Sequence, residues 1–226
     1  MDAYEAITTT RAIRRYRDEP IPEADLNRIL FAATRAPSGS NRQPFRFLVL
    51  RHGPAALEAR QVLAGCFAAL WGAKRAGDGY DTGSGTDPTS PKARMAATMQ
   101  HFVDHIADAS AIVLACTRAR HGGVLHDGAS VYPACQNLLL AARALGYGGV
   151  MTNWHQSEAA RLAEICGIPD DVTIAAVIPL GRPVGHHGPV RRRPLPDLVY
   201  EDRWEASAPW AVDPPGTRFT GGPPAP

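Results

Sequence analysis

Apolar residues recur along this 226-residue chain with two different spacings. Stretches in which they return every three to four positions predict amphipathic helices, whereas short continuous apolar runs bounded by turn residues predict buried strands. The helical pattern covers residues 3–10, 20–36, 54–73, 92–107, 127–145 and 156–167, and strands are expected at 45–51, 112–117 and 173–181, with a short strand or extended segment at 150–155. Because helices and strands mix without a regular βαβ alternation, the pattern predicts an α+β fold.

Two segments lack such periodicity. Residues 77–91 (GDGYDTGSGTDPTSP) are rich in Gly, Asp, Ser, Thr and Pro, which predicts a mobile surface loop long enough to act as a lid. After Trp204 the chain becomes rich in Pro and Gly and has no apolar pattern. We therefore expect one domain over residues 1–204 and a tail over residues 205–226 that is disordered or draped on a partner.

Composition and charge exclude several classes of protein. Lys and Arg total 24 against 22 Asp and Glu, a formal net charge of +2, so there is no general case for nucleic-acid binding. No apolar run approaches the ~20 residues of a membrane span. The polar N-terminus lacks the apolar core of a signal peptide, which predicts a cytoplasmic location. The four cysteines are widely separated and lie in apolar segments, so buried reduced thiols are expected rather than a metal site or disulfides.

Arginines cluster near both ends of the chain, in RAIRRYR (11–17) and in RRRP (191–194). Each cluster taken alone is typical of a solvated basic surface. Alternatively, the two clusters meet around a phosphate, since the planar guanidinium makes bidentate contacts with phosphate oxygens and stays charged. Neither cluster carries the interleaved aromatic residues that stack on bases, which disfavours a nucleic-acid site.

The loop APSGSNRQPF (36–45) carries further polar groups. Ser38, Ser40 and Asn41 supply hydroxyl and amide groups, and Gly39 allows the backbone to approach a ligand closely. Read as structure alone, the segment is a helix-to-strand connection. Its combination with the arginines is what favours a binding role.

Taken in order, RAIRRYR, APSGSNRQPF, LGYGGVMTN (145–153) and RRRPLPDLV (191–199) resemble the FMN-dependent nitroreductase superfamily, over about residues 4–204. The resemblance implies a central, mainly antiparallel sheet flanked by helices. It also implies an intertwined homodimer with two FMN sites at the subunit interface, and NADH or NADPH as co-substrate. The domain of residues 1–204 would then be the FMN-binding domain.

The resemblance assigns roles to both arginine clusters. Arg11 and Arg14 would bind the FMN phosphate and neighbouring ribityl groups, while Arg15 and Arg17 are expected to be solvated. Ala12 stands where the family usually has serine, so a side-chain hydroxyl contact is lost and only the backbone remains. At the other end, the basic motif that closes on the phosphate matches Arg191, Arg192 and Arg193, and which of these makes the contact is left open.

The remaining expected contacts involve the flavin ring and chain. Pro37, Ser38 and Asn41 match the family loop that lies along the flavin, with Asn41 contacting ring or ribityl atoms. Backbone groups that face the ring near N5 correspond to Met151, Thr152 and Asn153. A dinucleotide fingerprint at LGYGGV is excluded by context, because these glycines close a helix at Gly146 instead of opening one.

The reaction implied is transfer of electrons from NADH or NADPH, through flavin N5, to a small aromatic or conjugated acceptor such as a nitroaromatic, quinone or enone. One face serving both substrates predicts ping-pong kinetics. No hydrolase, zinc-protease or P-loop motif is present, and His101 and His105 in one helix lack a third metal ligand, which fits a flavin carrying the chemistry. Substrate choice is expected to depend on residues 71–99. Open alternatives are a different reaction on the same fold, a non-catalytic flavin-binding module, and a nucleic-acid-binding protein.

Overall fold

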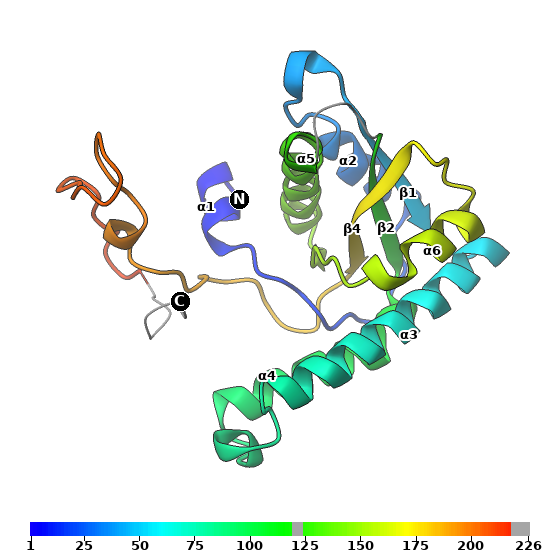
Figure 1. Ribbon diagram of the computed structural model, residues 1–226, viewed down its shortest axis with the longest axis horizontal. Helices are drawn as coiled ribbons and strands as arrows, with labels where there is room; N and C mark the ends of the chain where they lie inside the picture. The colour runs from blue at the N-terminus through cyan, green and yellow to red at the C-terminus, as the bar shows by residue number, and fades with distance from the viewer. Residues whose placement is uncertain (119–123, 218–226) are drawn as a thin grey trace. The chain divides into compact units, whose positions relative to one another are not determined.

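The computed structural model describes residues 1–118 and 124–217 of the chain (Figure 1). Contacts within the chain define two compact units, each of which is described by itself. The core unit is Ala12–His186, and the terminal unit combines Met1–Arg11 with His187–Pro226. The predicted division into residues 1–204 and a tail of residues 205–226 stays a prediction.

The core unit is built on a 4-stranded antiparallel sheet with strand order β1-β2-β4-β3. These strands are β1 (Phe45–Leu50), β2 (Ala111–Arg118), β4 (Val172–Gly181) and the short β3 (Gly148–Gly149). The observed sheet confirms the predicted α+β class with a mainly antiparallel sheet. Residues 150–155, predicted to be a short strand or extended, contribute a single bridge between Thr152 and Val177.

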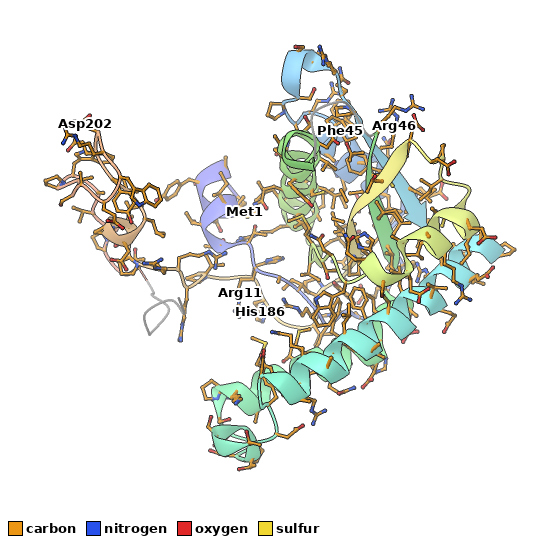
Figure 2. All side chains as sticks on the ribbon, in the orientation of Figure 1. Met1, Arg11, Phe45, Arg46, His186 and Asp202 are labelled. Carbon is orange, nitrogen blue, oxygen red and sulfur yellow. The ribbon has the colours of Figure 1, made fainter. Side chains whose placement is uncertain are left out.

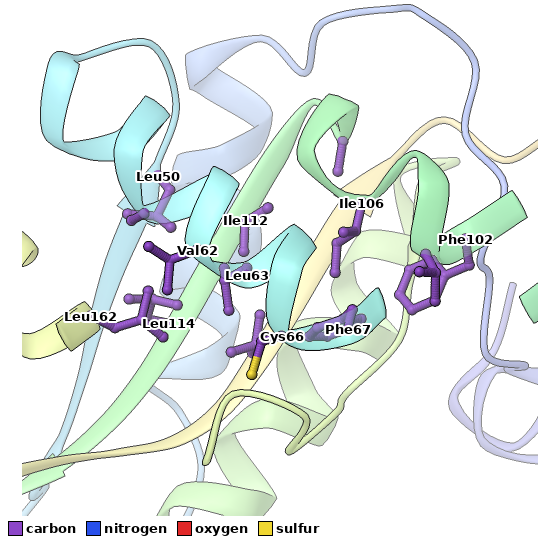
Figure 3. Close-up of a cluster of buried hydrophobic side chains, with 14 of the residues drawn as sticks. Leu50, Val62, Leu63, Cys66, Phe67, Phe102, Ile106, Ile112, Leu114 and Leu162 are labelled. Carbon is purple, nitrogen blue, oxygen red and sulfur yellow. The ribbon is translucent and has the colours of Figure 1, made fainter. Parts of the chain in front are cut away.

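Both faces of the sheet are covered by helices (Figure 1). Successive residues of β2 alternate between two cores, since neighbouring side chains on a strand point to opposite faces. Ile112 and Leu114 join one cluster with α3 (Pro54–Gly77), α4 (Pro91–Asp104) and α6 (Ala159–Cys166), part of which Figure 3 shows. Ala111 and Val113 join the other cluster, with α2 (Glu23–Ala33) and α5 (Val124–Ala144). Burial on both faces explains why this strand is a continuous apolar run.

Helix ends follow local signals that the sequence contains. Ser90 caps α4 by accepting a hydrogen bond from the amide of Ala93 at 3.0 Å, and Pro91 occupies the first turn. Gly146 follows α5 with a φ of 85°, which confirms the predicted stop. The predicted helix at 156–167 opens with a 3-10 turn at Gln156–Glu158 before α6 begins. Helix α3 continues four residues beyond the predicted end at 73, and its last turn carries Lys74, which pairs with Asp78 at 2.6 Å.

The segment 77–91, predicted to be a mobile loop, is organised by specific contacts. It contains a 3-10 turn at Gly83–Thr86. Arg75 holds the carboxylate of Asp81 through Nε and Nη2, with Nη2 at 2.8 Å from Oδ1. The segment joins α3 to α4 at the end of the hairpin that these two helices form (Figure 1).

The terminal unit contains α1 (Ala3–Thr9) and a 3-10 turn at Leu195–Asp197. Within residues 200–211, Tyr200 and Ser207 form a β-bridge, and Ala208 and Ala211 are buried. Several large apolar side chains of this unit are exposed, namely Tyr4, Ile7, Leu198, Trp204, Trp210 and Val212.

The structure also bears on the expectations about membrane spans, cysteines and metal sites. Within the described residues, no helix is both long and apolar enough to cross a bilayer. Cys66, Cys116 and Cys135 are buried free thiols, as predicted, whereas Cys166 is half-buried. Burial raises the pKa of Cys116 to about 11 and that of Cys135 to about 12, so both stay protonated near neutral pH. In the described part of the chain, no three His, Cys, Asp or Glu side chains are grouped to hold a metal ion.

Candidate functional site

The first arginine motif runs beside the ends of β3 and β4. The amide of Ile13 donates to the carbonyl of Gly149 at 2.9 Å, and the amide of Arg17 donates to the carbonyl of Arg182 at 2.8 Å. The hydroxyl of Tyr16 bonds to the carbonyls of Ile13 and Pro179 at 2.7 and 3.1 Å. This backbone pairing fixes the segment on the sheet and thereby sets the direction of the Arg14 side chain between two anchored neighbours.

Two glycines allow the motif to approach the sheet this closely. A Cβ atom at Gly181 would lie 2.8 Å from the ring of Tyr16, and one at Gly149 would lie 2.6 Å from the carbonyl oxygen of Pro179. Neither position has room for a side chain. From the sequence, the glycines of LGYGGV predict only the end of a helix. The close approach of Gly149 to Pro179 depends on the neighbouring strand β4, which lies elsewhere in the sequence.

Arg14 opens into a cavity of about 350 Å³ in the core unit. Burial lowers the pKa of its guanidinium, and in the described part of the chain no carboxylate forms an ion pair with it. The other lining residues are Met99, Phe102, Val150, Met151, Thr152, Asn153 and Trp154. The structure thus brings Arg14 together with Met151, Thr152 and Asn153, which lie far from it in the sequence. A half-buried cation without a counterion is suited to binding an anion or a polarised carbonyl group.

The segment 151–155 is held from beneath by β4 and α3. Thr152 exchanges two backbone hydrogen bonds with Val177, at 3.0 and 2.9 Å. The thiol of Cys66 donates to the carbonyl of Trp154 at 2.9 Å. With its side-chain amide turned to satisfy its neighbours, Asn153 donates to the carbonyls of Thr152 and Ala175. These bonds make the segment a fixed wall of the cavity.

His155 anchors the end of this segment in the core. Its ring is fully buried and its Nε2 lies 2.9 Å from the carbonyl oxygen of Ile174. Nδ1 has no hydrogen-bond partner in the described part of the chain. Burial lowers the pKa of His155, and the hydrogen bond to Ile174 opposes that shift. The ring is therefore neutral in the folded chain at neutral pH, with Nε2 carrying the proton that it donates to Ile174.

A pH dependence of stability follows from this burial. Because the folded-state pKa of His155 lies below its unfolded value, the unfolded chain binds the extra proton first as pH falls. Below about pH 6.5, this residue should lower the free energy of unfolding by at most about 1.4 kcal/mol per pH unit. Urea unfolding of the wild type and His155→Gln, at neutral pH and at acidic pH, measures the effect. Equal pH dependence in the two proteins would contradict it.

The remaining walls are apolar and aromatic. Phe67 links two of them, packing edge-on against Phe102 at 5.7 Å and against Trp154 at 5.4 Å between ring centroids. Of residues 71–99, which were expected to set substrate choice, only Met99 lines the cavity. Trp71 is instead buried, with its indole N–H donating to Gln100. Sequence reasoning missed Phe102 and Trp154, since an aromatic residue in a helix or loop carries no sign of facing a cavity.

The loop with Pro37, Ser38 and Asn41 lies at the opposite end of the sheet. It joins β1 at Phe45, which is labelled in Figure 2. Phe45 pairs with Thr117 of β2, and Thr117 pairs in turn with Thr173 of β4. Thr152 bridges to Val177, which lies four residues further along β4. Four residues correspond to about 13 Å along a strand. Within one core unit, therefore, this loop does not line the cavity of Arg14.

This loop has an unusual backbone. Ser40, Asn41 and Gln43 have positive φ angles of 53°, 52° and 50°. The amide of Gln43 donates to the hydroxyl of Ser38 at 2.9 Å, which helps to hold the turn. Left-handed conformations at three non-glycine residues store strain, a feature that clusters at ligand-binding loops.

Arg11 and the second arginine cluster belong to the terminal unit. The amide of Arg11 donates to His187 Nδ1 at 3.2 Å. Arg191 and Arg192 are exposed, and the half-buried Arg193 lies 3.9 Å from Asp197. In the core unit Ala12 is exposed, and so is Arg17, as predicted, whereas Arg15 is half-buried, with Nη2 3.5 Å from the carbonyl oxygen of Ala97. The expectation that Arg15 is solvated is wrong, because α4 packs over it.

Comparison with known proteins identifies the family of the chain. The Nitroreductase family model matches residues 7–182. An NADH dehydrogenase from Thermus thermophilus is 31% identical over 211 residues, which cover 88% of this chain and 95% of that protein. A crystal structure from Desulfovibrio desulfuricans, of "a putative nitroreductase in complex with fmn", is 30% identical with a TM-score of 0.63 and covers 89% of this chain and 96% of that one. The NADPH:FMN oxidoreductase of Vibrio harveyi, solved with NAD⁺, shares the fold at 21% identity with a TM-score of 0.66, covering 91% of this chain and 79% of that one. The matched family model and these relatives show that the chain belongs to the nitroreductase family and adopts its fold.

Proposed function

We propose that the chain is an FMN-dependent oxidoreductase that takes electrons from NADH or NADPH and passes them to a nitroaromatic, quinone or enone. The observation that carries this proposal is the half-buried Arg14, which has no carboxylate partner in the described part of the chain and lines a cavity whose other lining residues are mainly apolar. A flavin nucleotide presents an anionic phosphate and a planar ring edged by carbonyl groups. Both match the chemistry of this lining, and the similar Desulfovibrio desulfuricans structure in complex with FMN supports the choice of cofactor.

The chain's own residues would bind and orient the cofactor. Arg14 would donate hydrogen bonds to the flavin nucleotide, and the fixed backbone of Met151, Thr152 and Asn153 would form a wall for its ring. The chemistry that bound FMN would supply is redox chemistry: acceptance of a hydride from the nicotinamide and transfer of electrons to the second substrate. Apart from Arg14, none of the described residues that line this cavity is charged, and none is a histidine or cysteine. Water at an open site would provide protons, and successive use of one face by two substrates gives ping-pong kinetics.

A homodimer would complete the site. The loop with Pro37, Ser38 and Asn41 lies about 13 Å along the sheet from the wall at Thr152, so a second copy is needed to bring such a loop to the flavin. Large exposed apolar residues in both units support an interface, among them Phe31, Trp204 and Trp210. In that assembly we propose that Arg11 binds the phosphate and that Ala12 contributes only its backbone. One of the three arginines Arg191, Arg192 and Arg193 would close on the phosphate. A cytoplasmic location and the absence of a nucleic-acid partner stay predictions from the sequence.

Arg14→Ala tests the cofactor site. Loss of charge-assisted hydrogen bonds worth about 1.5–3 kcal/mol should raise the Kd for FMN by about 10- to 100-fold. Quenching of free FMN fluorescence during titration measures Kd directly. Arg28→Ala is a matched control, because the Arg28 side chain is 65% exposed on α2 and its ion pair with Asp25 is a surface contact. Equal Kd values for the wild type and Arg14→Ala would refute the assignment of Arg14.

A further inference from the structure

A second cavity, of about 550 Å³, also reaches Arg14. Since Arg14 lines both cavities, its guanidinium can donate to a group in each of them. The second cavity is the larger of the two and falls in the size range of small-molecule sites. Its other lining residues are Tyr16, Arg17, Asp18, His101, His105, Asp108 and Ala109.

Two histidines at the end of α4 form one wall of this second cavity. The rings of His101 and His105 lie 4.4 Å apart between centroids. His105 Nδ1 is 3.0 Å from a carboxylate oxygen of Asp108. The His101 ring has no hydrogen bond in the described part of the chain, and burial, His105 and Arg15 together lower its pKa, with Asp104 opposing them. An anion bound beside this ring would favour its protonated form.

The charges that face this cavity come from each element around it. The arginine motif contributes Arg14, Arg17 and the carboxylate of Asp18, and Arg17 also lies 3.7 Å from Glu19. From α4 and the turn that follows come the two histidines and Asp108, whose carboxylate His105 already holds. Among the described lining residues, Arg14 and Arg17 therefore balance the carboxylates of Asp18 and Asp108, and the imidazoles of His101 and His105 add hydrogen-bond donors to the cavity.

We propose that this second cavity binds the anionic substituent, a carboxylate or phosphate, of the substrate that exchanges electrons with the flavin. The inference rests on the proposed function, and it names the substrate class that the site selects. An oxyanion in the cavity accepts hydrogen bonds from Arg14 and His101, while the reacting part of the same substrate extends past Arg14 into the first cavity. Protonation of His101 adds a positive charge, so binding strengthens as pH falls toward the acidic side of neutrality.

Two acceptors of nearly equal shape test selectivity for an anion. For 4-nitrobenzoate relative to neutral 4-nitrobenzamide, the double variant His101→Gln/His105→Gln should raise the ratio of KM values about tenfold, the usual effect of losing a hydrogen bond to a charged group. The same comparison with reduced nicotinamide mononucleotide and reduced nicotinamide riboside tests a phosphate on the electron donor. A change in either ratio supports the proposal and identifies the source of the anion. Ratios that are unchanged for both pairs, as expected for the exposed control His186→Gln, would overturn it.

A binding measurement separates this inference from the proposed function. Inorganic phosphate should raise the pKa of His101, followed by NMR of the histidine ring protons in the wild-type chain, and leave that of His186 unchanged. An unchanged titration of His101 would refute the anion site even if the protein is an active flavoenzyme. If the double variant loses FMN affinity as Arg14→Ala does, the second cavity belongs to the cofactor site and the inference is likewise refuted.

Discussion

Replacing Arg60 with methionine is expected to lower the free energy of unfolding by about 3 kcal/mol or more, since three buried carbonyl groups would lose a charged donor. Arg60 is only 6% exposed. Its Nη1 donates to the carbonyls of Ala107 and Ala109, both at 2.7 Å, and its Nη2 donates to the carbonyl of Leu50 at 2.8 Å. One side chain of α3 thereby ties the end of β1 to the turn that leads into β2.

Urea unfolding measures this effect against a control on the same helix. Lys74→Met removes a surface ion pair with Asp78 and should lower the free energy of unfolding far less than Arg60→Met does. The pKa of Arg60 is lowered by burial, with Asp108 opposing that shift, yet the group stays charged at any ordinary pH. Methionine keeps an unbranched apolar stem at this position and removes the guanidinium that donates these hydrogen bonds. If Arg60→Met lowers the free energy of unfolding no more than Lys74→Met does, the hydrogen bonds of Arg60 do not contribute to stability.

Gly149→Ala is expected to damage both the fold and the proposed cofactor site. The added methyl group would lie 2.6 Å from the carbonyl oxygen of Pro179 and 2.7 Å from Leu180 Cδ2, so β3 must move away from β4. Overpacking of this kind costs about 1–3 kcal/mol. The same shift disturbs the hydrogen bond from Ile13 to Gly149, which positions Arg14, and the Kd for FMN should rise at least about tenfold.

The matched substitution is Gly72→Ala, in the middle of α3. A Cβ there meets no atom within 4 Å, and alanine should stabilise the helix by up to about 1 kcal/mol. Urea unfolding and FMN titration of both variants give the comparison. Unchanged stability and FMN affinity in Gly149→Ala would show that β3 tolerates a displacement, contrary to the packing described above.

Helices and strands were predictable where burial is periodic along the sequence. The run 112–117 was identifiable as a strand because helices cover both faces of the sheet, so every side chain in it except Thr117 is apolar. Helix ends were less predictable, because Lys74 extends α3 through a surface ion pair that periodicity does not register. The antiparallel order of the sheet followed from the family resemblance and not from the pattern.

Some residues of the candidate site were predictable from the sequence, and others were not. Arg14 and residues 151–153 were named in advance by resemblance, and the structure places them around one cavity. Burial of Arg60 and His155 was not predictable, since a polar residue in an apolar helix or loop is usually exposed until distant carbonyls such as Leu50 and Ile174 are brought to it. The second cavity was also missed, because His101 and the arginine motif meet only through the packing of α4.

The most direct test of the central claim is the visible absorption spectrum of the purified chain with added FMN, before and after anaerobic addition of NADH or NADPH. We expect a bound-flavin band that bleaches on reduction and returns when a nitroaromatic or quinone is added. A band that neither nicotinamide nucleotide bleaches would identify a non-catalytic flavin-binding module. A chain that fails to bind FMN at micromolar concentrations would contradict the proposed function and leave only the family and its fold.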